Sequence, residues 1–108
     1  MRERLESIFE RGSELFGRHL ESAGKWQEAA SLYQQAMEKS PLSEVFYQRL
    51  MICLQKQNRT NEALKVYSNC CHVLRAVLDA EPSSATEKLH RSLRAGINQN
   101  PPSSQPPV

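Results

Sequence analysis

Apolar residues recur along the first 97 positions at spacings of three and four, the pattern of amphipathic α-helices with one buried face. The first stripe stops at Gly24, a residue that readily takes the left-handed conformation ending many helices. The spacing therefore predicts a helix up to about residue 23. Its inner face is expected to comprise Leu5, Ile8, Phe9, Gly12, Phe16, Leu20 and Ala23.

A second helix is predicted from Trp26 to Lys39, because its stripe ends just before a proline. Pro41 has no backbone N–H and disfavours helical geometry at Ser40 before it. The inner face of this helix is expected to comprise Trp26, Ala29, Ala30, Tyr33, Ala36 and Met37.

Two further helices follow, with Ser43 as a suitable N-cap for the third and Asn58 as a suitable stop. Thr60 is the predicted cap of the fourth helix. No proline interrupts that helix before Pro82, so it should be longer than the second. The predicted inner faces are Phe46, Tyr47, Leu50, Met51 and Leu54 for the third, and Ala63, Leu64, Tyr67, Cys70, Leu74, Val77 and Leu78 for the fourth.

A fifth helix is expected to begin at Ser83 or Ser84, because Ser84-x-x-Glu87 has the form of a capping box. Its stripe is Leu89, Leu93 and Ile97. From Asn98 the composition changes to Asn, Gln, Pro and Ser, which cannot bury enough apolar surface to offset the entropy of ordering. We therefore expect one domain over residues 1–97 and a disordered tail over 98–108.

One block occurs twice: the residues from Glu28 to Ala36 return, in type, from Glu62 to Cys70, after 34 residues. A period of this length is typical of stacked helical hairpins, in which each hairpin covers the apolar side of its neighbour. The sequence therefore predicts an all-α fold, with two antiparallel hairpins stacked together and a closing fifth helix. The repeated Ala-x-x-x-Tyr positions are expected to form the stack itself, namely Ala29, Tyr33, Ala63 and Tyr67.

The first unit resembles the tetratricopeptide repeat through Phe16-Gly17-x-x-Leu20, Ala29-x-x-x-Tyr33 and Pro41, although the second unit has Met51 and Arg75 where that family has glycine and proline. A narrower resemblance covers about residues 3 to 95. The junctions Pro41-Leu42-Ser43-Glu44 and Glu81-Pro82-Ser83, with the Leu50-Met51 pair, resemble the bacterial transcriptional activator domain. The resemblance implies a short helical domain of bacterial transcription regulators, usually joined after a winged-helix DNA-binding domain.

Composition changes this picture little. The chain carries 14 basic and 12 acidic residues, for a net charge of +2, and the two signs are interspersed. A clustered basic face, as nucleic-acid binders have, is not indicated. The first residues are charged rather than apolar, and three cysteines without framework spacing favour a reducing compartment. We expect a cytoplasmic protein that binds neither nucleic acid nor membrane directly.

Candidate chemistry is sparse. Cys70-Cys71-His72 lacks the paired ligand spacing of a structural zinc site, and adjacent helical residues point about 100° apart. The favoured interpretation is core-lining cysteine, with metal binding or redox sensing as the alternative. The histidines His19, His72 and His90 have no nucleophile or acid at a recognisable motif spacing. The sequence predicts no enzyme, cofactor or metal site.

Candidate contact residues lie on two helices. Arg4, Arg11 and Arg18 recur every seven residues beside Glu14 and Glu21, which indicates a solvated face with i,i+3 and i,i+4 ion pairs, or else a contact strip. The third helix is expected to line a concave groove, as it would in a tetratricopeptide stack. The predicted protein-binding residues are Glu14, Arg18, Tyr47, Gln48, Ile52 and Gln55.

The function predicted from the family resemblance is a non-catalytic interaction domain of a bacterial transcription regulator. It would mediate oligomerisation, or docking to the transcription machinery or a sensor domain. Its partners would be proteins: a second copy, an upstream DNA-binding domain, or the transcription machinery. Two alternatives remain open at this point. One is a free-standing tetratricopeptide-like adaptor, and the other is a small-ligand sensor that uses the groove.

Overall fold

A computed structural model describes the backbone of residues 2–99 and the side chains of residues 8–95. Five α-helices follow one another and, within this part of the chain, no strand occurs. The all-α prediction is confirmed. The helices are α1 (Arg2–Ser22), α2 (Trp26–Lys39), α3 (Glu44–Lys56), α4 (Thr60–Leu78) and α5 (Ser84–Gln99).

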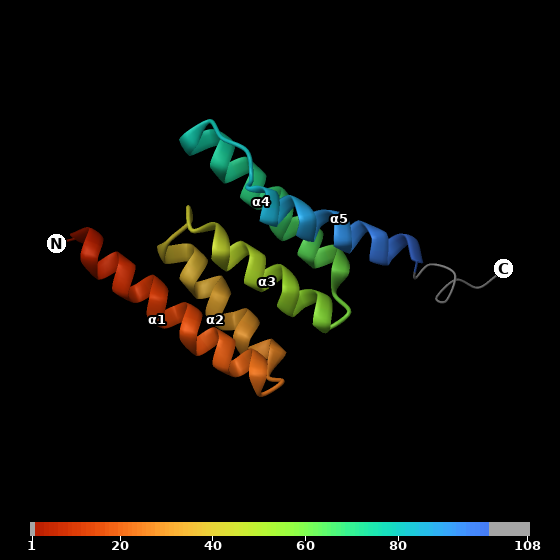
Figure 1. The fold of residues 1–108 in the computed structure, drawn as a ribbon, viewed down its shortest axis with the longest axis horizontal. Helices are drawn as coiled ribbons and strands as arrows, with labels where there is room; N and C mark the ends of the chain where they lie inside the picture. Colours follow the sequence, from red (N-terminus) through yellow and green to blue (C-terminus); the bar gives the residue numbers. More distant parts are fainter. Residues whose placement is uncertain (1, 100–108) are drawn as a thin grey trace.

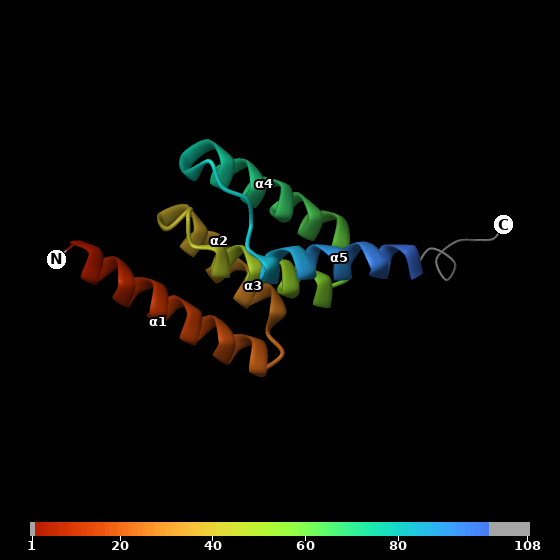
Figure 2. The same ribbon diagram turned by 45° about the horizontal axis from the view of Figure 1, so that its top comes forward.

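The helices form a stack in chain order. Helices α1 and α2 make one antiparallel hairpin, α3 and α4 make the next, and α2 packs against both α1 and α3 (Figure 1). Helix α5 then packs against α4 and α3, as the turned view also shows (Figure 2). This is the tetratricopeptide-like arrangement that the repeat predicts, with α5 as the closing helix.

The loops end the helices largely as the sequence indicates. Gly24 has a φ of 77° and Asn58 a φ of 62°, both in the left-handed region. Asp79, which was not predicted to do so, ends α4 with a φ of 51°. Helix α4 has 19 residues and α2 has 14, so the predicted difference in length is confirmed.

The helix starts differ in detail. Ser43 occupies the N-cap of α3, but its side chain makes no capping hydrogen bond. Thr60 was predicted to cap α4, whereas it is the first helical residue and Arg59 takes the cap position. Helix α5 continues to Gln99, two residues beyond the predicted boundary. The predicted tail from residue 100 onward and the side chain of Ile97 lie outside the described residues.

The core lies where α2 and α3 meet. Tyr33, Phe46 and Met51 are fully buried there, and the predicted inner faces of both helices are confirmed, with Trp26 and Met37 partly buried at the margin. Cys53 is a fully buried member of this cluster that the predicted face omitted. The small side chains at the hairpin crossings are also buried, since Ala29 and Ala63 are 0 % exposed.

Two predicted inner faces are partly wrong. On α1, Ile8, Gly12, Phe16 and Ala23 are exposed, while the face toward α2 carries Ser13, Gly17, Leu20 and Glu21. The cause is the Tyr33 ring, which occupies the place of a Cβ at Gly17, so the glycine side of α1 turns inward. On α4, Val77 and Leu78 are exposed because they lie in the last turn, beyond the packed part of the helix.

Candidate protein-interaction surfaces

The six predicted contact residues do not form one exposed surface. Glu14 and Arg18 pair at 3.2 Å on the outside of α1. Tyr47 is only 2 % exposed, and its hydroxyl donates to the carbonyl of Pro41 at 2.7 Å. Tyr47 therefore packs in the core rather than on an open surface. Ile52 and Gln55 remain half-buried on α3.

Helix α5 covers part of the α3 face that was predicted to be a groove. Gln48 donates from Nε2 to Oγ1 of Thr86 at 2.8 Å, so this side chain binds α5. Glu44 Oε2 accepts hydrogen bonds from the Ser83 backbone at 2.7 Å and from the Thr86 hydroxyl at 2.5 Å. Thr86 is fully buried. These contacts fix the start of α5 on α3, and we call Glu44, Gln48 and Thr86 the α5 latch.

Helix α5 also binds α4. The Tyr67 hydroxyl donates to Glu87 at 2.8 Å, and the Tyr67 ring stacks on His90 with centroids 3.8 Å apart and planes 4° apart. Burial raises the pKa of the Tyr67 phenol, and its hydrogen-bonding partners raise it further. Tyr67, the second of the two repeated tyrosines, therefore binds the closing helix α5.

A buried charged group joins the first three helices. Glu21 on α1 accepts a hydrogen bond from the Tyr33 hydroxyl at 2.6 Å. Its carboxylate also forms a bidentate ion pair with the guanidinium of Arg49 on α3. Burial raises the pKa of the Glu21 carboxyl, but the bonds from Arg49 and Tyr33 lower it by more, so the pKa lies below its ordinary value. We call Glu21, Tyr33 and Arg49 the buried triad.

The buried triad corrects one prediction. Glu21 was expected on a solvated face of α1, whereas its side chain is 8 % exposed. Glu14 on the same predicted track does form the expected i,i+4 pair with Arg18. Local spacing could not separate the two carboxylates, because the partner of Glu21 comes from a helix 28 residues away.

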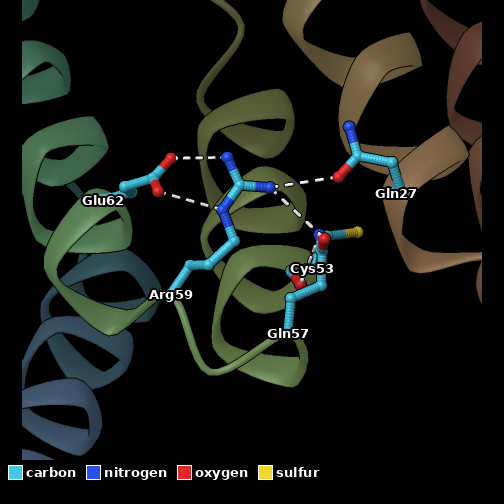
Figure 3. Close-up of polar contacts among 5 residues, drawn as sticks. All are labelled: Gln27, Cys53, Gln57, Arg59 and Glu62. Carbon is cyan, nitrogen blue, oxygen red and sulfur yellow. Dashed lines mark hydrogen bonds and ion pairs between the residues drawn. The ribbon is translucent and has the colours of Figure 1, made fainter.

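A groove of about 410 Å³ runs between α2 and α4 over α3. Its apolar lining includes Leu50 and Leu54, and its polar lining includes Gln27 and Lys65. Arg59 is also part of this lining: its guanidinium binds Glu62 at 2.6 and 3.0 Å and Gln27 at 3.0 Å (Figure 3). The sequence predicted a concave groove lined by α3, but it did not predict these lining residues, which come mainly from two helices that are 34 residues apart in the repeat.

Large apolar side chains are exposed on α1. Ile8 is 62 % exposed, Leu15 is 63 % exposed and Phe16 is 54 % exposed. Gly12 lies among them, and a Cβ added there would meet no atom within 4 Å. Contiguous exposed apolar surface of this kind marks interaction sites in soluble proteins.

The cysteines are mainly core residues. Cys53 and Cys70 are fully buried, and burial raises the pKa of each thiol to about 12. Cys71 is half-buried. Over the described residues, no three His, Cys, Asp or Glu side chains gather where they could hold a metal ion. In the same part of the chain, no helix combines the length and apolar character of a membrane span.

The comparisons with known proteins agree with the helical stack. The family model described as the bacterial transcriptional activator domain matches residues 1–94. This match spans α1 to α4 and most of α5. No curated protein and no solved structure gives a significant match.

Proposed function

The chain belongs to the bacterial transcriptional activator domain family, and we propose that it is the non-catalytic protein-interaction domain of a bacterial transcription regulator. In this role it mediates oligomerisation or docks to the transcription machinery or a sensor domain. The protein acts in the cytoplasm, where bacterial transcription takes place. The family match over residues 1–94 is the observation that carries the proposal.

The exposed surfaces support a role in protein binding. Half-buried Ile52 and Gln55 on α3, together with the Glu14 and Arg18 pair on α1, remain candidates for direct contact. Tyr47 and Gln48 act indirectly, because they hold the α2–α3 loop and α5 in place. The partners are proteins: a second copy, the DNA-binding domain of the same regulator, or the transcription machinery.

A reporter experiment tests the proposal. The chain is fused to a heterologous DNA-binding domain that does not activate transcription alone. The operator of that DNA-binding domain is placed upstream of a weak promoter in bacterial cells. A second reporter uses an operator that only a dimeric fusion occupies. We expect the chain to change transcription in at least one of the two reporters, and no change in either, from a folded fusion, would contradict the proposal.

Surface variants sharpen this experiment. Replacing Ile52 and Gln55 together by alanine removes contact atoms on α3, so the response should fall by about fivefold if these residues meet the partner. The matched control replaces Ser68 and Asn69 of α4 by alanine, since both are exposed there. Circular dichroism checks that both variants keep their helix content. Equal responses from the two variants would remove α3 from the contact surface.

A second candidate function is a free-standing adaptor for a peptide unrelated to transcription. The groove between α2 and α4 favours it, because an apolar lining with amide and charged side chains suits a bound segment. The sequence of the gene upstream of Met1 separates the two functions. A winged-helix segment in the same reading frame supports the regulator, and a complete gene without a DNA-binding or signalling domain supports the adaptor.

A further inference from the structure

The outward face of α1 carries an apolar stripe between Ile8 and Phe16. Successive residues of a helix turn by about 100°, so positions four and seven apart lie on the same side. Ile8, Gly12 and Leu15 have this spacing, and Phe16 lies beside them. The opposite side of α1, at Ser13 and Gly17, packs against α2. The stripe therefore faces away from the molecule at one end of the stack.

The fold of a single molecule does not explain why residue 12 is a glycine. Glycine in a helix interior is less favourable than alanine by about 0.8–1 kcal/mol, and nothing in the described structure fills the space above this one. Gly17 on the same helix contrasts with it, because the Tyr33 ring occupies the corresponding space there. A glycine flanked by exposed apolar side chains allows the backbone of another helix to come close.

We propose that this face binds the same face of a second copy, with the two α1 helices antiparallel and crossing at Gly12. The pairing deepens the proposed function, on which it rests, by naming one partner and the surface that meets it. A twofold axis makes such an interface isologous, so one apolar stripe serves both copies. The large side chains then interlock on either side of the crossing, and Ile8 lies level with Phe16 of the second copy.

Charge on the flank of the stripe favours a second copy as the occupant. Arg11 and Glu14 lie on the same side of α1, and in an antiparallel pair each flank faces the identical flank of the other copy. With the axis at Gly12, Arg11 comes within about one residue, or 1.5 Å along the helix, of the level of Glu14 of the second copy. Two symmetry-related ion pairs therefore border the apolar contact, each with a Glu14 carboxylate that also pairs with Arg18 of its own copy.

Sedimentation equilibrium of the 108-residue chain tests the pairing. We expect a reversible monomer–dimer equilibrium. Leu15→Glu buries a charge in the contact and should weaken dimerisation by about tenfold or more. Val77→Glu is the matched control, because Val77 is 61 % exposed but lies at the end of α4. It should leave the dissociation constant within about twofold.

Gly12→Leu provides a second variant that is compatible with the monomer fold. The space above Gly12 is open and leucine is a better helix former, so the monomer should remain folded while the close crossing is blocked. Circular dichroism and thermal unfolding of dilute samples verify the fold of each variant. A dimer that tolerates both Leu15→Glu and Gly12→Leu would overturn the proposal, because it would use another surface.

A charge exchange tests the antiparallel register. Arg11→Glu brings two carboxylates together at each flank contact of its homodimer, and Glu14→Arg brings two guanidinium groups together there. Each variant alone should therefore associate more weakly at low salt. In a mixture of the two variants, the new glutamate of one copy meets the new arginine of the other copy, so opposite charges are restored. We therefore expect heterodimers to form more tightly than either homodimer. Equal association in all three samples would contradict the register.

The outcomes separate the pairing from the wider function. A wild-type chain that stays monomeric at the highest soluble concentration overturns the pairing. This outcome includes the possibility that a different domain, rather than a second copy, covers α1. The promoter reporter can still respond in that case, which leaves the proposed function intact. A dimer disrupted by both α1 variants, together with a silent promoter reporter, supports the pairing and removes docking to the transcription machinery, which leaves oligomerisation as the role of the domain.

Discussion

At the scale of single residues, the carboxylate of Glu21 is a buried charge on which the first three helices converge. It is nearly fully buried, and the hydroxyl of Tyr33 and the guanidinium of Arg49 satisfy its oxygens. Such a group stabilises a fold only while its partners are in place, since a buried charge without them is costly. The buried triad therefore makes the docking of α1 sensitive to single substitutions.

Replacing Glu21 by glutamine should lower the free energy of unfolding by about 2 kcal/mol at neutral pH, because the charged hydrogen bonds to Arg49 are lost. The pKa of Glu21 is lowered from 4.5 in the folded state, so its stabilisation is complete above that value and lost as the pH falls through the folded pKa. The difference in the free energy of unfolding between the wild type and the variant should therefore become smaller in acid. Urea unfolding followed by circular dichroism at several pH values measures it.

The control is Glu28→Gln, which changes an exposed carboxylate on α2. It should shift the free energy of unfolding by less than about 0.5 kcal/mol. A gap for Glu21→Gln that stays constant from neutral pH to strong acid would show that ionisation of Glu21 does not stabilise the fold.

The two glycines of α1 provide a matched comparison. Gly17→Ala forces a methyl group against the Tyr33 ring, and overpacking of this kind should lower the free energy of unfolding by about 1–3 kcal/mol. Gly12→Ala meets open space and should raise it by about 0.5–1 kcal/mol through better helix propensity. Urea unfolding of dilute samples measures both, and equal effects would contradict the packing described for α1.

The residue-level predictions succeeded where side-chain type alone decides burial. Ala29, Tyr33 and Leu50 are apolar residues on strongly periodic helices, and their burial follows from the stripe. Glu21 and Gly17 could not be recognised in this way. Their positions depend on a tyrosine that approaches α1 from the next helix, and no local pattern encodes that approach.

At the scale of helices, α5 differs from the others in how it is attached. Its apolar anchors are Leu93, which is buried, and Leu89, which is half-buried. Hydrogen bonds from the α5 latch and from Tyr67 supplement them. The ends of α1, α2 and α3 were predicted well because Gly24, Pro41 and Asn58 mark them. The latch was not predicted, because Thr86 is about 40 residues from Glu44 and Gln48 in the sequence.

Thr86→Val tests the latch. The substitution keeps the shape of the side chain but removes its hydroxyl, so Glu44 loses a donor and Gln48 loses an acceptor. We expect a loss of about 1–3 kcal/mol in the local stability of α5. Native-state hydrogen exchange should show faster exchange of the α5 amides and unchanged exchange in α2.

Ser92→Ala is the control for this experiment, because Ser92 is an exposed residue of the same helix. It should leave exchange in α5 unchanged. Uniform acceleration across all helices in Thr86→Val would instead show that α5 opens only when the whole domain unfolds.

At the scale of the whole molecule, the stack has two ends that are held by different chemistry. The buried triad and the glycine contact hold α1 at one end, and the latch holds α5 at the other. Helix α3 takes part in both, through Arg49 toward α1 and Glu44 toward α5. Stacked helical repeats distribute their stability over such neighbouring contacts. The repeat predicted the stack and a groove over α3, whereas the residues that form the exposed end face and those that line the groove could not be read from the period.

The double variant Gly17→Ala/Thr86→Val asks whether the two ends are independent. The two sites share no hydrogen-bonding partner among the described residues, so their effects on the free energy of unfolding should add to within about 0.5 kcal/mol. Urea unfolding of the wild type, both single variants and the double variant completes the cycle. A coupling well above that value would mean that α3 transmits strain between the ends, so that a partner bound at α1 could alter the attachment of α5. Additive effects would instead allow the α1 face to bind a second copy while α5 and the groove remain unchanged.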